Sequence, residues 1–128
     1  MKELNEVIDS IRSYLEEKDF IIQVNGDAIV CRHKDIPIFL DIRIRDKNAI
    51  IQLRVSSEEL REYLEEQVES GENVVELVDE YLSEIRDTAI DISRLLKKKR
   101  WNVSIDLREG ESDVRDLLEE IIEEHSIF

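Results

Sequence analysis

The sequence predicts an α+β protein in which an antiparallel sheet of about five strands packs against amphipathic helices in two layers. Apolar residues recur at helical spacing at both ends of the chain, whereas from residue 20 to residue 55 they alternate with a period of two. The length of 128 residues suits one domain with its own core. No linker, repeat or low-complexity segment divides the chain, so we expect a single domain over residues 1–128.

The first expected element is a helix over residues 2–18. Its apolar residues are three or four positions apart and are separated by Glu and Lys, which is typical of a helix that lies on an apolar surface. These residues are Leu4, Val7, Ile8, Ile11, Tyr14 and Leu15.

Two hairpins are expected next, between residues 20 and 55. Asn25-Gly26 indicates a type I′ turn, since both central residues of that turn need a positive φ. The second turn is expected at Lys47-Asn48. Pro37 at the start of the third strand fits a sheet edge or a strand entry, and we favour an edge. The predicted pairs are Phe20 with Cys31, Ile22 with Ile29, Leu40 with Val55, Ile42 with Leu53 and Ile44 with Ile51. Each predicted pair keeps its two side chains on one face.

The second half of the chain reads mainly as helix. Ser56 and Glu59 form a capping-box pattern that opens a helix. A helical pattern over residues 72–99 would be roughly 40 Å long, so we expect it to protrude, to break at residues 86–88 or to pack against a second chain. A fifth strand over 101–107 and a last helix capped by Ser112, after a turn at residues 109–111, complete the prediction.

Composition excludes several classes of function. With 18 Lys and Arg against 32 Asp and Glu, the net charge of −14 argues against nucleic-acid and anionic-membrane partners. A single cysteine excludes a disulfide framework, and no apolar run reaches the roughly 20 residues that span a bilayer. The acidic N-terminal segment is unlike a signal peptide, so we expect a cytoplasmic location. The 39% of charged residues and the 18 isoleucines are typical of a thermophile.

Catalytic motifs are not found, and we expect no cofactor, no metal and no catalytic residue. The three glycines are too far apart for a phosphate-binding loop. The sharpest constellation is Cys31, His33 and Asp35, which would share one strand face as a thiol, an imidazole and a carboxylate. That row suits a metal site or a small enzyme that uses Cys31 and His33, but we favour a core cysteine opposite Phe20.

Two further clusters favour structural roles. His125 lies beside Glu123 and Glu124, but adjacent helix residues point about 100° apart, so both carboxylates cannot share the face of the histidine. The basic run 97–100 beside Trp101 suits a helix C-terminus followed by a core tryptophan better than a phosphate-binding patch.

The charge is divided between the predicted sheet and the predicted helices. Residues 20–55 hold six Lys or Arg against four acids, and the rest of the chain holds 12 against 28. Arginine, aliphatic and aromatic residues therefore meet on the sheet face that points away from the core, as they do in protein interfaces. A helix of the same chain covering this face is the alternative. The candidate interface residues are Arg32, Phe39, Arg43, Arg45, Ile50 and Arg54.

The order helix, antiparallel strands, helix, strand and C-terminal helix in a small acidic chain resembles the type III secretion chaperone-like fold. The resemblance implies binding of a partner polypeptide, dimer formation and no catalytic residue. The chain differs from that family in having four strands before the middle helix and an extra helical stretch over 72–99.

The sequence thus favours a non-enzymatic protein-binding or chaperone-like module that associates with itself, as a homodimer, or with another protein. An acidic regulator that mimics nucleic acid and occupies a basic surface is the alternative. The residues that it would use are Glu62, Glu65, Glu66, Glu69, Glu72 and Glu76.

Overall fold

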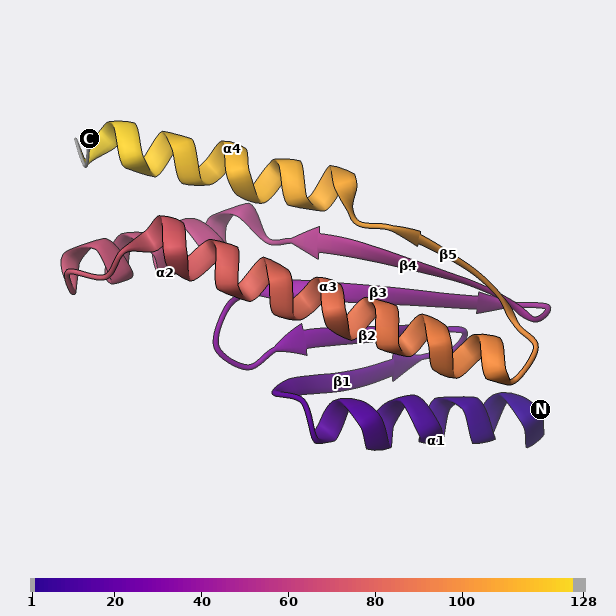
Figure 1. Cartoon of the computed structure of the whole chain (residues 1–128). Helices are drawn as coiled ribbons and strands as arrows, with labels where there is room; N and C mark the ends of the chain where they lie inside the picture. The colour runs from indigo at the N-terminus through magenta and orange to yellow at the C-terminus, as the bar shows by residue number, and fades with distance from the viewer. Residues whose placement is uncertain (1, 126–128) are drawn as a thin grey trace.

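A computed structural model describes residues 2–125, and Figure 1 shows the chain from end to end. It confirms the α+β class. The elements are α1 (Lys2–Glu16), β1 (Phe20–Asn25), β2 (Ala28–His33), β3 (Ile38–Arg45), β4 (Asn48–Val55), α2 (Ser57–Glu69), α3 (Val74–Lys98), β5 (Asn102–Asp106) and α4 (Arg108–Glu124).

The five strands form one sheet in the order β1-β2-β3-β4-β5. The first four are antiparallel, as expected, but β5 is parallel to β4, with Asn48 opposite Asn102. The reason is visible in Figure 1, where α3 carries the chain back to the end of the sheet at which β4 begins. A strand that starts from that end must run parallel to β4. The sheet is therefore mixed rather than wholly antiparallel.

Both hairpins turn one residue away from the predicted positions. The first turn has Gly26 and Asp27 at its centre, and the second has Asp46 and Lys47, with positive φ at Gly26 and at both residues of the second turn. Each pairing is therefore shifted by two residues from the prediction. The observed pairs include Ile22 with Cys31, Val24 with Ile29, Leu40 with Leu53, Ile42 with Ile51 and Ile44 with Ala49. A shift of two keeps every side chain on its predicted face.

Pro37 does not mark a sheet edge. It is buried just before β3, which pairs with β2 on one side and with β4 on the other. The missing N–H of a proline is tolerated there because the ladder starts only at Ile38.

The long helix α3 is continuous, so the predicted break at residues 86–88 is wrong. The Thr88 hydroxyl donates to the Glu84 carbonyl at 2.9 Å, and Ile85 and Ala89 are buried on either side. The helix contacts β4 and β5 as well as the other three helices. These contacts bury apolar residues from its first turn to its last, which explains why a helix of this length neither breaks nor protrudes.

The predicted caps of α2 and α4 need correction. Ser56 occupies the N-cap of α2, but its side chain makes no capping hydrogen bond. Helix α4 begins at Arg108, so Ser112 is not its cap and residues 109–111 are helix rather than a turn. Gly110 is buried against β4, and a Cβ there would lie 2.3 Å from the Leu53 carbonyl oxygen.

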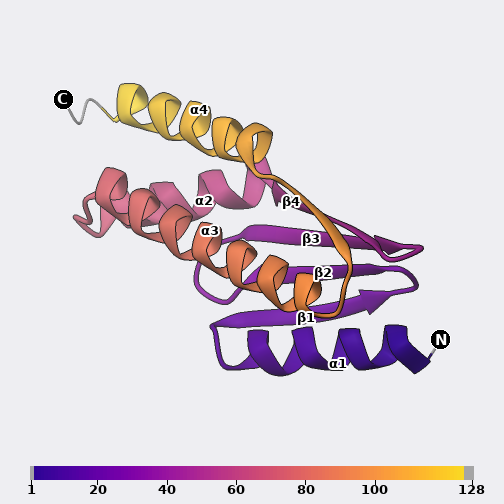
Figure 2. The same cartoon turned by 45° about the vertical axis from the view of Figure 1, so that its right-hand side comes forward.

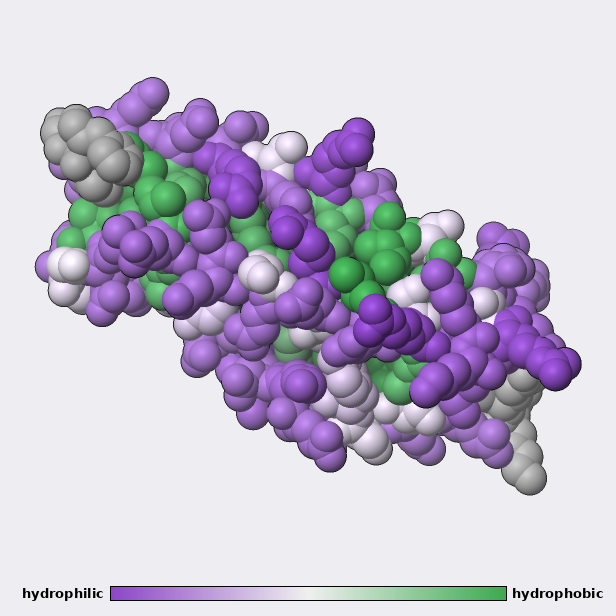
Figure 3. Space-filling model, in the orientation of Figure 1, coloured by the Kyte–Doolittle hydropathy of each residue, from purple (hydrophilic) through white to green (hydrophobic). Residues whose placement is uncertain are grey.

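The core lies between the helices and one face of the sheet. Ile29, Cys31, Leu40, Ile42 and Ile51 of that face are 0–1% exposed and belong to one cluster with buried residues of all four helices. Figures 1 and 2 show the helices on this side of the sheet. Their solvent side is mostly hydrophilic, with hydrophobic residues between the polar ones (Figure 3). No helix within residues 2–125 has the length and apolar character needed to cross a membrane.

Candidate functional site

The side of the sheet opposite the helices, which we call the outer face, is formed by alternate residues of all five strands. Strand register arranges them in rows that run across the sheet. The first row is Ile21, Arg32, Phe39 and Arg54, and the second is Gln23, Val30, Asp41, Gln52 and Asp106. The third row is Asn25, Ala28, Arg43, Ile50 and Ser104, and the fourth is Arg45, Asn48 and Asn102. All six residues predicted for an interface therefore lie on this face.

Phe39 lies between two guanidinium groups in the first row. The Arg54 guanidinium carbon is 4.3 Å from the ring centroid, and that of Arg32 is 5.9 Å away. Each arginine is held by a carboxylate: Arg54 Nε donates to Asp41 at 2.8 Å, and Arg32 donates to Glu59 of α2 at 3.3 Å. Contacts within the chain therefore hold the Phe39 ring and the two guanidinium groups in one arrangement. Such an arrangement would lower the entropic cost of binding a partner at this surface.

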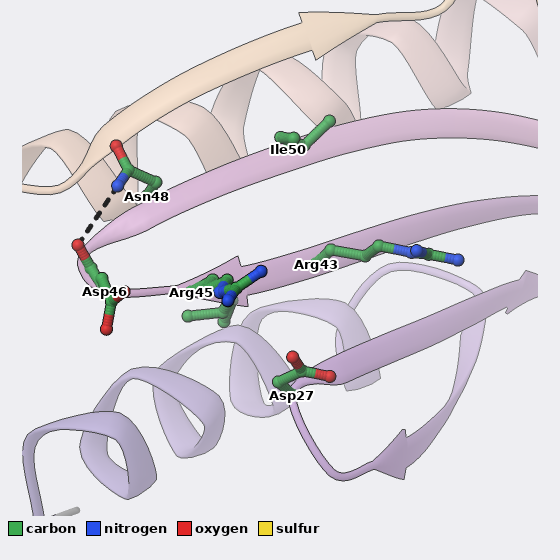
Figure 4. A pocket seen from close by; sticks show the side chains of 7 residues that line it. Asp27, Arg43, Arg45, Asp46, Asn48 and Ile50 are labelled. Atoms are coloured by element: carbon green, nitrogen blue, oxygen red, sulfur yellow. Dashed lines mark hydrogen bonds between the residues drawn. The ribbon is translucent and has the colours of Figure 1, made fainter.

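A hollow of about 350 Å³ lies at the hairpin end of the outer face, between the two turns. In Figure 4, Arg43 and Arg45 extend from β3 and Ile50 lies on β4, while Asp27 comes from the turn between β1 and β2. The side chain of Asn48 donates to the Asp46 carbonyl at 3.2 Å and so braces the turn. The hollow thus combines apolar wall with basic side chains.

No described helix packs over the centre of the outer face, so the alternative of a covering helix from the same chain does not hold for residues 2–125. Ile21 is 55% exposed and Ile50 is 45% exposed. Phe39 and Val30 are half-buried, and the Arg54 guanidinium group covers part of the Phe39 ring. The described part of the chain therefore leaves an aliphatic and aromatic surface open to solvent.

A second hollow, of about 270 Å³, joins the outer face to the start of α4. Asp106, Glu109 and Asp113 line it together with Arg43 and Arg54. Sequence reasoning missed this acidic rim because it depends on two facts that periodicity does not give: β5 is parallel to β4, and α4 begins before Gly110.

The predicted row of Cys31, His33 and Asp35 is not assembled as a reactive site. Cys31 is fully buried, and burial followed by the charge of Asp41 raises the pKa of its thiol to about 12. The thiol therefore stays protonated at neutral pH and is a poor nucleophile or metal ligand. The side chain of Asp35 is exposed beyond the end of β2.

His33 is a satisfied core residue. Its ring is 1% exposed and lies edge-on to the rings of Phe20 and Tyr81. The Asp35 backbone N–H donates to Nδ1 at 3.1 Å, so the ring proton must be on Nε2, which is 3.2 Å from a carboxylate oxygen of Glu84. Both ring nitrogens are therefore occupied by protein groups.

His125 forms a cluster with Glu124 but not with Glu123. Ligand atoms of Glu65, Glu124 and His125 lie within 4.8 Å of one another. Arg61 already occupies this cluster, since its Nη1 donates to both oxygens of Glu124 at 3.2 Å and lies 3.7 Å from Glu65. A metal ion would have to displace that cation.

The residues of the basic run and of the acidic set are not part of the outer face. Residues 97–100 end α3, and Trp101 is only 6% exposed, so its ring does not offer a stacking surface to a base. Of the six glutamates in the acidic set, five are exposed on α2, α3 and the loop between them, and Glu65 is engaged by Arg61.

Comparisons with protein-family models, with curated proteins and with solved structures found no match.

Proposed function

We propose that the protein is a binding module for another polypeptide and that the outer face is its binding surface. The observation that carries this proposal is the uncovered face on which Phe39 is fixed between Arg32 and Arg54. Aromatic and arginine residues are the side chains most enriched at the centres of protein interfaces. Burial of Ile21, Val30, Phe39 and Ile50 by a partner would remove apolar area from water, at roughly 25 cal/mol per Å².

The chemistry of the rest of the chain supports binding rather than catalysis. The two groups that suggested an enzyme, Cys31 and His33, lie on the covered face, where both are nearly inaccessible. A general base needs to reach the proton that it abstracts, and the two ring nitrogens of His33 are already engaged by Asp35 and Glu84.

The acidic regulator is the second candidate, because the end of the molecule formed by α2 and the start of α3 exposes carboxylates without matching cations. Glu62, Glu66 and Glu69 form no ion pair with any residue in the described range. This candidate places the binding surface on α2 and the start of α3 rather than on the outer face, so one experiment separates the two.

The experiment is site-specific photo-cross-linking with a benzophenone amino acid at residue 50 or at residue 90. Ile90 is the matched control, since it is an isoleucine 37% exposed on α3, on the helix side. In a lysate of the cells that produce the protein, we expect a discrete polypeptide adduct from position 50 and little from position 90. The charge-reversing variant Arg43→Glu, with circular dichroism to verify its fold, should lose the adduct.

Equal yields at positions 50 and 90 would show that the outer face is not a defined docking surface. An adduct from a benzophenone at position 66 that exceeds the adduct from position 50 would favour the acidic regulator instead.

A further inference from the structure

The outer face carries two kinds of arginine, and the difference indicates what the partner offers. Arg32 and Arg54 are each paired with a carboxylate of the same chain. Arg43 and Arg45 form no ion pair with any residue in the described range, and both are exposed. Both guanidinium groups lie on the same strand and the same face, near the carboxylates that line the two hollows but without an ion pair to them.

The apolar residues of the same face form a diagonal. Ile21 lies in the first row on β1, Val30 in the second row on β2, and Ile50 in the third row on β4. Three strand spacings and two rows separate Ile21 from Ile50, which corresponds to about 20 Å. Arg32 and Arg54 lie on one side of this diagonal, and Arg43 and Arg45 lie on the other side.

We propose that the occupant of the outer face is an acidic amphipathic helix of a partner protein. A helix of about 13 residues spans about 20 Å and presents one apolar stripe with polar flanks. Its stripe would lie on the diagonal, and its flanking carboxylates would meet the guanidinium groups of Arg43 and Arg45. This inference rests on the proposed function and specifies the partner that the outer face takes.

A helix suits a sheet face better than an extended segment does. The backbone groups of the three central strands are used within the sheet, so an extended peptide lying across the face would bury N–H and C=O groups without partners. A helix satisfies these groups internally. The inner face of the same sheet illustrates the arrangement, since it is covered by helices whose solvent sides are acidic.

The hollow beside Ile50 lies at one end of the diagonal and would receive one end of the partner helix. Ile50 lines the hollow together with Arg43 and Arg45, whose aliphatic stems suit an aliphatic side chain of the partner. Asp27 and Asp46 line the same hollow together with Arg43 and Arg45, so the hollow holds two carboxylates and two guanidinium groups, and an apolar side chain of the partner suits it better than a charged one.

Polyanions are a poorer match for the same arginines. The 32 acidic residues repel a nucleic acid or an anionic bilayer at long range, whereas a short helix with a few carboxylates meets mainly the local field of the outer face. Phe39 is already stacked on Arg54 and is not free to stack on a base.

The test uses two synthetic helical peptides of about 16 residues. Both have leucines at i, i+3, i+4 and i+7, and one has Glu on the flanks of the stripe where the other has Lys. Binding is measured by fluorescence anisotropy at low salt. We expect the wild-type protein to bind the Glu peptide at least about tenfold more tightly than the Lys peptide.

Variants locate the binding. The double variant Arg43→Gln/Arg45→Gln should bind the Glu peptide about tenfold more weakly, and Ile50→Ser should weaken it as well. Arg12→Gln/Arg108→Gln is the matched control, because it removes two exposed arginines from α1 and α4 that likewise form no ion pair with described residues. This control should bind like the wild type.

Equal binding of both peptides, or undiminished binding by the Arg43→Gln/Arg45→Gln variant, overturns the inference. If neither peptide binds while position 50 still captures a polypeptide, the acidic helix is wrong and the proposed function stands. If neither peptide binds and positions 50 and 90 cross-link equally, both are wrong. A wild-type dimer in sedimentation that the double variant dissociates would identify a second copy as the occupant, which also overturns the inference.

Discussion

At the scale of single residues, Asp41 links the covered and the open sides of the sheet. One carboxylate oxygen holds Arg54 at 2.8 Å, while the other is buried without a hydrogen-bond partner among the described residues. The Asp41–Arg54 pair holds the guanidinium carbon 4.3 Å from the centroid of the Phe39 ring.

The buried thiol of Cys31 makes a residue-scale prediction about alkaline stability. Its pKa is raised from the ordinary value of about 9 to about 12, so above pH 9 the unfolded chain loses a proton that the folded chain keeps. The folded state therefore loses stability as the pH rises from about 9 towards 12, by the order of 1 kcal/mol per pH unit. Below pH 9 the thiol is protonated in both states and contributes no pH dependence.

Urea unfolding of the wild type and of Cys31→Ala between pH 8 and pH 10 measures this contribution. We expect the free energy of unfolding of the wild type to fall more steeply above pH 9 than that of the variant. The buried tyrosines, whose pKa values are also raised by burial, are the same in both proteins and cancel in the comparison. Parallel pH profiles would show that Cys31 is not desolvated.

At the scale of elements, periodicity predicts which face a residue occupies better than it predicts register. The alternation over residues 20–55 places Phe39, Arg43 and Ile50 on one face whether the turn is centred at 46–47 or at 47–48. Register depends instead on which residues accept a positive φ, and here Asp46 does so although it is not glycine. The candidate interface was therefore predictable, whereas the pair partners were not.

Long-range packing explains the elements that the sequence misplaces. Gly110 has the sequence signature of a turn, but it is buried in the first turn of α4 because no larger residue fits against the Leu53 carbonyl. The continuity of α3 likewise depends on partners that local pattern does not reveal, since β5 and α1 support its C-terminal half only after folding. The acidic rim beside α4 depends on the same kind of long-range packing, so the local sequence pattern does not predict it either.

Gly110→Ala tests the close approach of α4 to β4. The added Cβ would lie 2.3 Å from a backbone oxygen, so the helix has to move away from the strand. We expect a net loss of about 1–3 kcal/mol, because the overpacking cost exceeds the helix-propensity gain of about 1 kcal/mol. The midpoint of urea unfolding measures it.

Ser112→Ala is the control for that variant. Ser112 is exposed in the same helix, and its replacement should change stability by no more than about 0.5 kcal/mol. A loss of about 1 kcal/mol would instead indicate that Ser112 caps the helix, contrary to the helix start at Arg108. A Gly110→Ala variant as stable as the wild type would show that α4 does not contact β4 so closely.

At the scale of the whole molecule, the net charge of −14 is the sum of two unlike surfaces. The helix side carries most of the acids, and the outer face carries arginines around an apolar diagonal. The acidic side keeps polyanions and other copies of the same side at a distance, while the arginine side remains attractive to a carboxylate-bearing partner at short range. Charge distribution, rather than net charge, therefore distinguishes the proposed binding surface from the rest of the molecule.

The same imbalance predicts how salt changes stability. Surface ion pairs such as Arg86 with Glu111 and Arg115 with Asp79 are weakened by salt, but each contributes only about 0–1 kcal/mol. With 32 acids against 18 bases, the carboxylates outnumber the cations that could pair with them, and screening relieves the net repulsion. We expect sodium chloride between about 20 mM and about 0.5 M to raise the Tm by a few degrees.

Glu66→Gln/Glu69→Gln/Glu72→Gln, which removes three exposed carboxylates, should raise the Tm at low salt and reduce its salt dependence. A Tm that falls with added salt would mean that the ion pairs outweigh the repulsion between the helices.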